Sequence, residues 1–120
     1  MADVGQFIIA YAPFKQDHSQ GKIRPCLVLA VAMHGEHKVL LCAPESTQTH
    51  KVHSPYEVML SGKELQKIGL YKDCVIRFAR TDLVAIMDRD VRNTLGRVAD
   101  LSHGLQVSIR NAAKSVGCAV

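Results

Sequence analysis

Short apolar runs separated by polar stretches occupy most of the chain before residue 90. The runs at 5–12, 24–33 and 38–43 are rich in Val, Ile and Leu, which is typical of strands that other parts of a protein cover. Gly35 lies in the polar segment 34–37 between the second and third runs. Glycine adopts the positive φ that a tight turn needs, so the pattern predicts a β-hairpin formed by these two runs.

Two longer polar segments and three further apolar runs complete this part of the chain. The segments 15–22 and 44–54 are made largely of polar residues, a composition that predicts loops. The second segment is the longer one, and we expect it to be exposed and mobile. The runs 56–60, 74–78 and 82–87 predict three more strands.

Helical signals appear in the middle and at the end of the chain. Ser61 and Glu64 have the spacing of a capping box, which predicts a short helix over 61–69 that ends at Gly69. After residue 90 the apolar spacing becomes close to that of a helix, and Asp100 or Ser102 can cap the second of two stripes. The stripes consist of Val91, Leu95 and Val98, and of Leu101, Leu105, Ile109, Ala112 and Val116.

The order of these elements, with strands first and helices last, predicts an α+β fold. The simplest architecture is a strongly curved, barrel-like antiparallel sheet that carries a C-terminal helix. The sequence has 120 residues and contains no internal repeat, low-complexity tract or linker. We therefore expect residues 1–120 to form a single domain.

Composition and charge narrow the functional classes. Hydrophobic residues make up 48% and charged residues 22% of the chain, so a disordered protein is not expected. The net charge of +4 permits a polyanionic partner without requiring one. No apolar run approaches the ~20 residues of a membrane span. No basic residue precedes the first apolar run, so we expect a cytoplasmic protein without a signal peptide and without a membrane partner.

The cysteines and histidines do not form a metal motif. None of the cysteines is arranged as CxxC, and most lie inside apolar runs, which favours buried free thiols in a reducing cytosol. The histidine pairs His34/His37 and His50/His53 lie in polar segments without a nearby cysteine. We expect no metal and no cofactor. The cysteines are Cys26, Cys42, Cys74 and Cys118.

Three polar clusters lie at the ends of the predicted strands. They are the segment 18–24, the segment 45–49, and Arg77 followed by Arg80. If the second and third strands pair as a hairpin, Arg24 lies at the same sheet edge as Ser46 and Thr47. A guanidinium beside hydroxyl groups is a plausible phosphate site, because the arginine can bind two phosphate oxygens.

Each of these residues also has a simpler interpretation. A loop arginine before a proline, such as Arg24, is usually a solvated surface residue, and a loop histidine such as His18 is more often exposed than catalytic. The interpretation of Arg77 depends on where the side chains of its neighbours Ile76 and Phe78 point. If both point into the core, Arg77 points outward and needs no special role. If they do not, Arg77 is a partly buried arginine that needs an anion.

The order and spacing of several short motifs resemble those of the MazF/PemK toxins, over roughly residues 5 to 116. The first two motifs are the start of the first apolar run at 5–9 and an Arg-Pro-hydrophobic segment at 24–29. The others are the end of the third strand at 43–48, the strand 56–60, and the segments 69–76 and 95–98. The resemblance implies a dimeric toxin of a toxin–antitoxin pair with an SH3-like barrel, a short mid-chain helix and a C-terminal helix. It also implies single-stranded RNA as substrate and a cognate acidic antitoxin as partner.

Members of this family cleave RNA without a metal. The ribose 2′-OH attacks the adjacent phosphate and leaves a 2′,3′-cyclic phosphate and a 5′-OH. By position, Arg24 matches the family's catalytic arginine. Ser46, which Thr47 follows, matches the position of the family's catalytic threonine. His18 and Arg77 match the loop histidine and second arginine of the PemK/Kid branch. Other polar residues near these positions are expected to contact RNA, namely Lys15, Lys22, Gln48, His50, Lys51 and Arg80.

The chain departs from the family pattern at several positions, which keeps other functions open. Ala79 stands where the PemK/Kid branch has an active-site aspartate, so His18 or a different group would act as the base. Ser19, the displaced Gly21 and Cys74 are further departures. One alternative is a non-enzymatic toxin that binds DNA gyrase as the CcdB relatives do. The other is an inactive SH3-like binding module.

Overall fold

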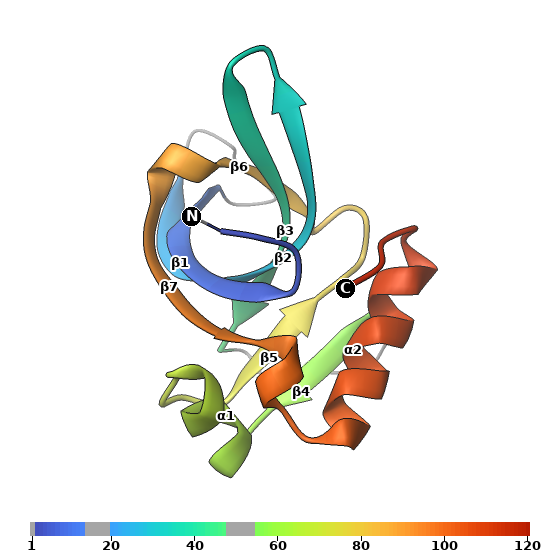
Figure 1. The fold of residues 1–120 in the computed structure, drawn as a ribbon. Coiled ribbons are helices and arrows are strands. Elements are labelled where there is room, and N and C mark those ends of the chain that lie inside the picture. The colour runs from blue at the N-terminus through green and yellow to red at the C-terminus, as the bar shows by residue number, and fades with distance from the viewer. Residues whose placement is uncertain (1, 14–19, 48–54) are drawn as a thin grey trace.

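The computed structural model describes residues 2–13, 20–47 and 55–120. Within them the chain forms a curved antiparallel sheet, two α-helices and two short 3₁₀ turns (Figure 1). The strands are β1 (Gln6–Pro13), β2 (Gly21–His34), β3 (His37–Ser46), β4 (Glu57–Leu60), β5 (Cys74–Arg77), β6 (Val84–Met87) and β7 (Val91–Arg97). The helices are α1 (Lys63–Ile68) and α2 (His103–Ser115), and the 3₁₀ turns are η2 (Asp88–Asp90) and η3 (Val98–Asp100).

The strands of the described residues pair in the order β4-β5-β3-β2-β1-β7, and β6 pairs with β3 beside this path. This arrangement confirms the predicted α+β class with a curved antiparallel sheet and a C-terminal helix. The sheet does not close on itself, so the SH3-like barrel stays a prediction. Among the described residues, no helix is long and apolar enough to cross a membrane.

The β2–β3 hairpin is the longest feature of the sheet and extends beyond its other strands (Figure 1). His34 pairs with His37 across the turn, and Gly35 has a φ of 64°, which confirms the predicted hairpin. Both strands are longer than expected, because β2 already begins at Gly21 and β3 continues to Ser46. The predicted loops 15–22 and 44–54 were therefore wrong at these ends, where pairing with neighbouring strands overrides the polar composition.

Two clusters of buried apolar side chains lie within the described part of the chain. The α2-side cluster includes Phe7, Leu27 and Ile109 and lies between the sheet and the helices. The second cluster includes Ile8 and Val28, which follow Phe7 and Leu27 in β1 and β2. Successive side chains of a strand point to opposite faces, so β1 and β2 contribute to both clusters. All four cysteines are free and three of them are buried, which confirms the prediction of buried thiols.

The segment 91–98 was predicted as a helix, and this prediction was wrong. Residues Val91–Arg97 form β7, which pairs with β1. The apolar spacing fits a helix, but pairing with β1 decides the conformation. Gly96 lies where β7 crosses the end of α1, and a Cβ atom at this position would lie 2.8 Å from the Ile68 Cα. A glycine is therefore needed for this close approach.

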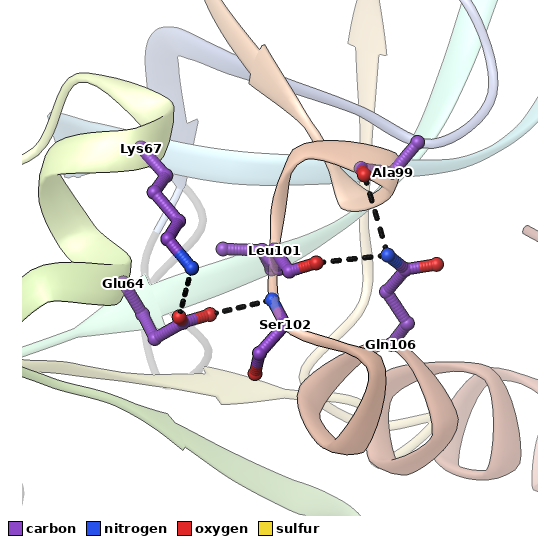
Figure 2. A network of polar contacts seen from close by, with 6 residues as sticks. All are labelled: Glu64, Lys67, Ala99, Leu101, Ser102 and Gln106. Carbon is purple, nitrogen blue, oxygen red and sulfur yellow. Dashed lines mark hydrogen bonds and ion pairs between the residues drawn. The ribbon is translucent and has the colours of Figure 1, made fainter.

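The predicted helices α1 and α2 are present, but the predicted capping box of α1 was wrong. Gly62 is the N-cap of α1 and makes no side-chain capping bond, whereas Gly69 ends the helix in the left-handed conformation as predicted. The Glu64 carboxylate binds elsewhere. It accepts hydrogen bonds from the Lys67 ammonium at 2.6 Å and from the Ser102 backbone N–H at 2.8 Å (Figure 2).

Glu64 therefore joins α1 to the start of α2. Ser102 is the N-cap residue of α2, as expected from the sequence, although its side chain forms no capping bond. The Gln106 side chain supports the same corner, since its Nε2 donates to the carbonyl oxygens of Leu101 at 2.8 Å and Ala99 at 3.2 Å (Figure 2). We call this network the α1–α2 junction.

Candidate active site

The register of the sheet places Arg24 and Ser46 toward the same end of the β2–β3 hairpin. Cys26 of β2 pairs with Pro44 of β3, and Arg24 and Ser46 each lie two residues further along their antiparallel strands in the direction of that end. Ser46 in turn pairs with Val75 of β5. The sequence prediction that Arg24 and Ser46 share one edge of the β2–β3 hairpin agrees with this pairing.

Arg77 lies on the same face, two residues after Val75 in β5. Its neighbours Ile76 and Phe78 are buried in the α2-side cluster, so Arg77 points to the opposite side, as the first of the two alternatives requires. It is nevertheless not an ordinary surface residue. Its Nη1 donates to the Glu57 Oε2 at 2.7 Å, and the two side chains are only 22% and 13% exposed. Strand β4 supplies Glu57 through direct pairing with Arg77.

We call the surface formed by Arg24, Ser46, Glu57 and Arg77 the arginine face. Burial lowers the pKa of the Arg24 guanidinium, the nearby Cys26 thiol acts in the opposite direction, and the positive charge of Arg77 lowers the pKa further. The two guanidinium groups are thus close enough to repel each other. A bound anion would relieve this repulsion, because it attracts both cations.

Glu45 lies directly behind the arginine face, and the sequence analysis missed its role. Glu45 is buried, with only 2% of its surface exposed, and this burial raises the pKa of its carboxyl group to about 8. The Cys74 Sγ donates a hydrogen bond to its Oε1 at 3.4 Å, whereas its buried Oε2 has no hydrogen-bond partner among the described residues. The raised pKa favours the protonated, neutral form of the Glu45 carboxyl group at neutral pH. The polar sequence from Glu45 to Thr47 looks like a loop, and no local pattern indicates that the strand continues to Ser46.

The remaining candidate residues fall into three groups. Lys22 is an exposed residue of β2 and alternates onto the same side as Arg24, which makes it a neighbour of the arginine face. Thr47 is exposed just after β3, and Arg80 is exposed in the turn that follows β5, outside the sheet. The other predicted residues lie outside the described residues, namely Lys15, His18, Gln48, His50 and Lys51.

The arginine face has the chemistry of a phosphodiester site. Two guanidinium groups supply charged N–H donors to phosphate oxygens, and the Ser46 hydroxyl can donate a further hydrogen bond. Among the described residues, no three His, Cys, Asp or Glu side chains gather in a way that would hold a metal ion.

Comparison with known families agrees with this arrangement. No curated protein matches the chain. Residues 5–116 match the family described as PemK-like, MazF-like toxins of type II toxin–antitoxin systems. The match covers nearly all of the 120 residues and includes every element from β1 to α2. The chain therefore belongs to the PemK-like, MazF-like toxin family of type II toxin–antitoxin systems.

Proposed function

We propose that this toxin is a sequence-selective, metal-independent endoribonuclease that cleaves single-stranded messenger RNA and so inhibits translation and growth. The observation that carries the proposal is the approach of Arg24 and Arg77 on one face of the sheet, where burial and mutual repulsion lower the pKa of Arg24. Membership of the family supports the same activity. Structural like charges are normally kept apart, whereas a phosphodiester substrate needs them together.

In the proposed mechanism, the ribose 2′-OH attacks the adjacent phosphorus and the bond to the 5′-oxygen of the next nucleotide breaks. Arg24 and Arg77 stabilise the negative charge that develops on the non-bridging oxygens. Ser46, with Thr47 next to it, donates a hydrogen bond to the same phosphate. His18 is proposed to accept the 2′-OH proton near neutral pH. The leaving 5′-oxygen takes up a proton from water, and the products carry a 2′,3′-cyclic phosphate and a 5′-OH.

Two partners follow from this proposal. Single-stranded RNA needs a basic channel that is several nucleotides long, and we propose that a second copy of the chain completes it in a homodimer. Lys15, Lys22, Gln48, His50, Lys51 and Arg80 are the proposed RNA contacts outside the arginine face. The other partner is a cognate acidic antitoxin, which would neutralise the basic channel in the cytoplasm.

The test is cleavage of a defined RNA by the purified protein in the presence of EDTA, followed by analysis of the ends. We expect discrete cuts, 5′ ends that a kinase labels without phosphatase treatment, and cyclic phosphates at the 3′ ends. Arg24→Ala should give no detectable cuts in the time that the wild type needs to cleave the RNA. Absence of cleavage by the wild-type protein would overturn the proposal. Growth inhibition that depends on gyrase would then favour the CcdB-like alternative, and the absence of toxicity would favour the inactive binding module.

A further inference from the structure

Glu57 and Arg77 form an ion pair between two neighbouring strands of the sheet. Glu57 and Arg77 are direct cross-strand partners of β4 and β5, and the Arg77 Nη1 lies 2.7 Å from the Glu57 Oε2. Both side chains are largely withdrawn from water, with 22% and 13% exposure. By contrast, Lys67 of the Glu64–Lys67 pair is 44% exposed. Water therefore screens the Glu57–Arg77 pair less strongly.

The ion pair with Glu57 occupies one N–H donor of Arg77 and leaves other donors of the guanidinium available to a ligand. A guanidinium has five N–H donors in a rigid fork. The bond to Glu57 uses Nη1 and limits the directions in which the guanidinium can point. Arg77 is also close enough to Arg24 for its charge to lower the pKa of that residue. Without the carboxylate, repulsion from Arg24 would favour other rotamers of Arg77.

We propose that Glu57 is a positioning residue of the active site, which holds the Arg77 guanidinium so that it and Arg24 meet the same phosphate group. This inference rests on the proposed ribonuclease function. Glu57 itself acts through Arg77 and does not touch the substrate. The sequence analysis assigned it no role.

A double-mutant cycle tests this dependence. Glu57→Ala should lower the single-turnover rate of RNA cleavage by about 10- to 100-fold, the range expected when a catalytic donor is misplaced. Glu57→Gln should lower it by less than about fivefold, since the amide oxygen still accepts a hydrogen bond from Arg77. In an Arg77→Met background, Glu57→Ala should change the rate by less than about threefold, because the group that Glu57 positions is already missing.

Other outcomes would overturn the inference. Equal losses for Glu57→Gln and Glu57→Ala, with the same loss in the Arg77→Met background and a shifted pH profile, would identify Glu57 as a general base. A wild-type rate for Glu57→Ala would show that the pair has no role in catalysis. Glu64→Gln is the matched control, since it alters a carboxylate–ammonium pair in α1, away from the arginine face. Circular dichroism checks that each variant is folded.

A second measurement does not depend on cleavage. In ¹⁵N spectra, the guanidinium protons of Arg77 should exchange with water more slowly in the wild type than in Glu57→Ala. The affinity for an oligonucleotide with a 2′-deoxyribose at the cleavage site should fall at least about threefold in the same variant. If the wild type cleaves no RNA, the proposed function fails, and these two measurements still decide the role of Glu57. Unchanged exchange and unchanged affinity would exclude it.

Discussion

The α1–α2 junction and the arginine face use charged side chains in opposite ways. At the junction, the Glu64 carboxylate meets an ammonium and a backbone N–H, and these bonds lower its pKa. On the arginine face, two guanidinium groups approach each other, and the pKa of Arg24 is lowered through burial and the charge of Arg77. The junction stabilises its charges, whereas the arginine face destabilises one of them.

This difference distinguishes charged groups that stabilise the fold from charged groups that are available to bind a ligand. Partnered charges of the junction type hold elements together and need nothing from outside the chain. Like charges that are brought together by sheet register cost stability in the free protein, and that cost is recovered when an anion binds. Four substitutions test the contrast, from the largest expected effect to the smallest.

Arg24→Ala should have the largest effect. We expect RNA cleavage to slow by about 10²–10³-fold, or roughly 3–4 kcal/mol, because a donor to the developing charge is lost. Stability should stay within about 0.5 kcal/mol of the wild type or increase, since repulsion from Arg77 disappears. Rate measurements and urea unfolding check the two parts. Arg24→Lys should also be strongly impaired, because lysine cannot make the two-pronged contact.

Arg110→Ala on α2 is the matched control for this prediction. Arg110 is exposed and binds Gln106 and the Val120 carbonyl oxygen, so its removal should leave cleavage unchanged. A wild-type cleavage rate for Arg24→Ala would show that the arginine face has no role in catalysis, and the contrast with the α1–α2 junction would not hold.

Glu45→Gln tests how much stability the protein loses by burying the Glu45 carboxyl group behind the arginine face. Burial raises the pKa of Glu45 from 4.5 to about 8, so the carboxyl is neutral in the folded protein while the unfolded chain ionises above pH 4.5. Folding then takes up a proton, and the contribution of Glu45 to stability falls as pH rises from about 4.5 to about 8. The loss is complete above pH 8.

The measurement is urea unfolding of the wild type and of Glu45→Gln between pH 4.5 and pH 8.5. The difference between the two proteins isolates Glu45 from the other titrating groups, because they are common to both. Glu45→Gln should become relatively more stable as pH rises through this window. A difference that does not vary with pH would mean that Glu45 is already ionised in the folded protein.

Gly96→Ala tests the contact that allows the α1–α2 junction to form. The new Cβ would lie 2.8 Å from the Ile68 Cα and 3.0 Å from the Lys67 carbonyl oxygen, so the backbone of β7 or α1 must move. We expect a loss of about 1–3 kcal/mol in the free energy of unfolding, measured in urea. Gly104→Ala is the control, since no atom lies within 4 Å of its Cβ position. Equal stabilities of the two variants would contradict the close approach.

Glu64→Ala should have the smallest effect. The Lys67 partner is 44% exposed and the pair lies near the surface, so water screens the bond between the two side chains. We expect a small decrease in Tm that disappears in high salt, with an unchanged rate of RNA cleavage per folded molecule. A loss of cleavage in this variant would show that the junction belongs to the active site, and the comparison of the two regions would fail.

Local signals predicted the β2–β3 hairpin. A turn glycine between two apolar runs predicts pairing of neighbouring strands, and that pairing leaves Arg24 and Ser46 toward the same end of the hairpin. The same kind of reasoning was wrong for 91–98, because Val91, Leu95 and Val98 fit helical spacing while pairing with β1 decides the structure. Local periodicity cannot detect a partner that lies more than 80 residues away in the sequence.

The acidic residues of the site were not predictable for the same reason. The importance of Glu57 arises from its pairing with Arg77 across β4 and β5, which are separated by α1. Glu45 is buried because Ile76 of β5 lies opposite it. Both roles depend on which strands meet in space, and no residue pattern within either segment carries that information.

The distribution of thiols gives the protein a natural attachment point for a probe. Burial raises the thiol pKa well above its ordinary value at Cys26, and likewise at Cys42 and Cys74. Buried thiols that stay protonated react slowly with maleimides, because the thiolate is the nucleophile. Cys118 is only partly buried and follows the end of α2. A fluorophore added to the native wild-type chain should therefore attach at one position, without any cysteine having to be introduced or removed.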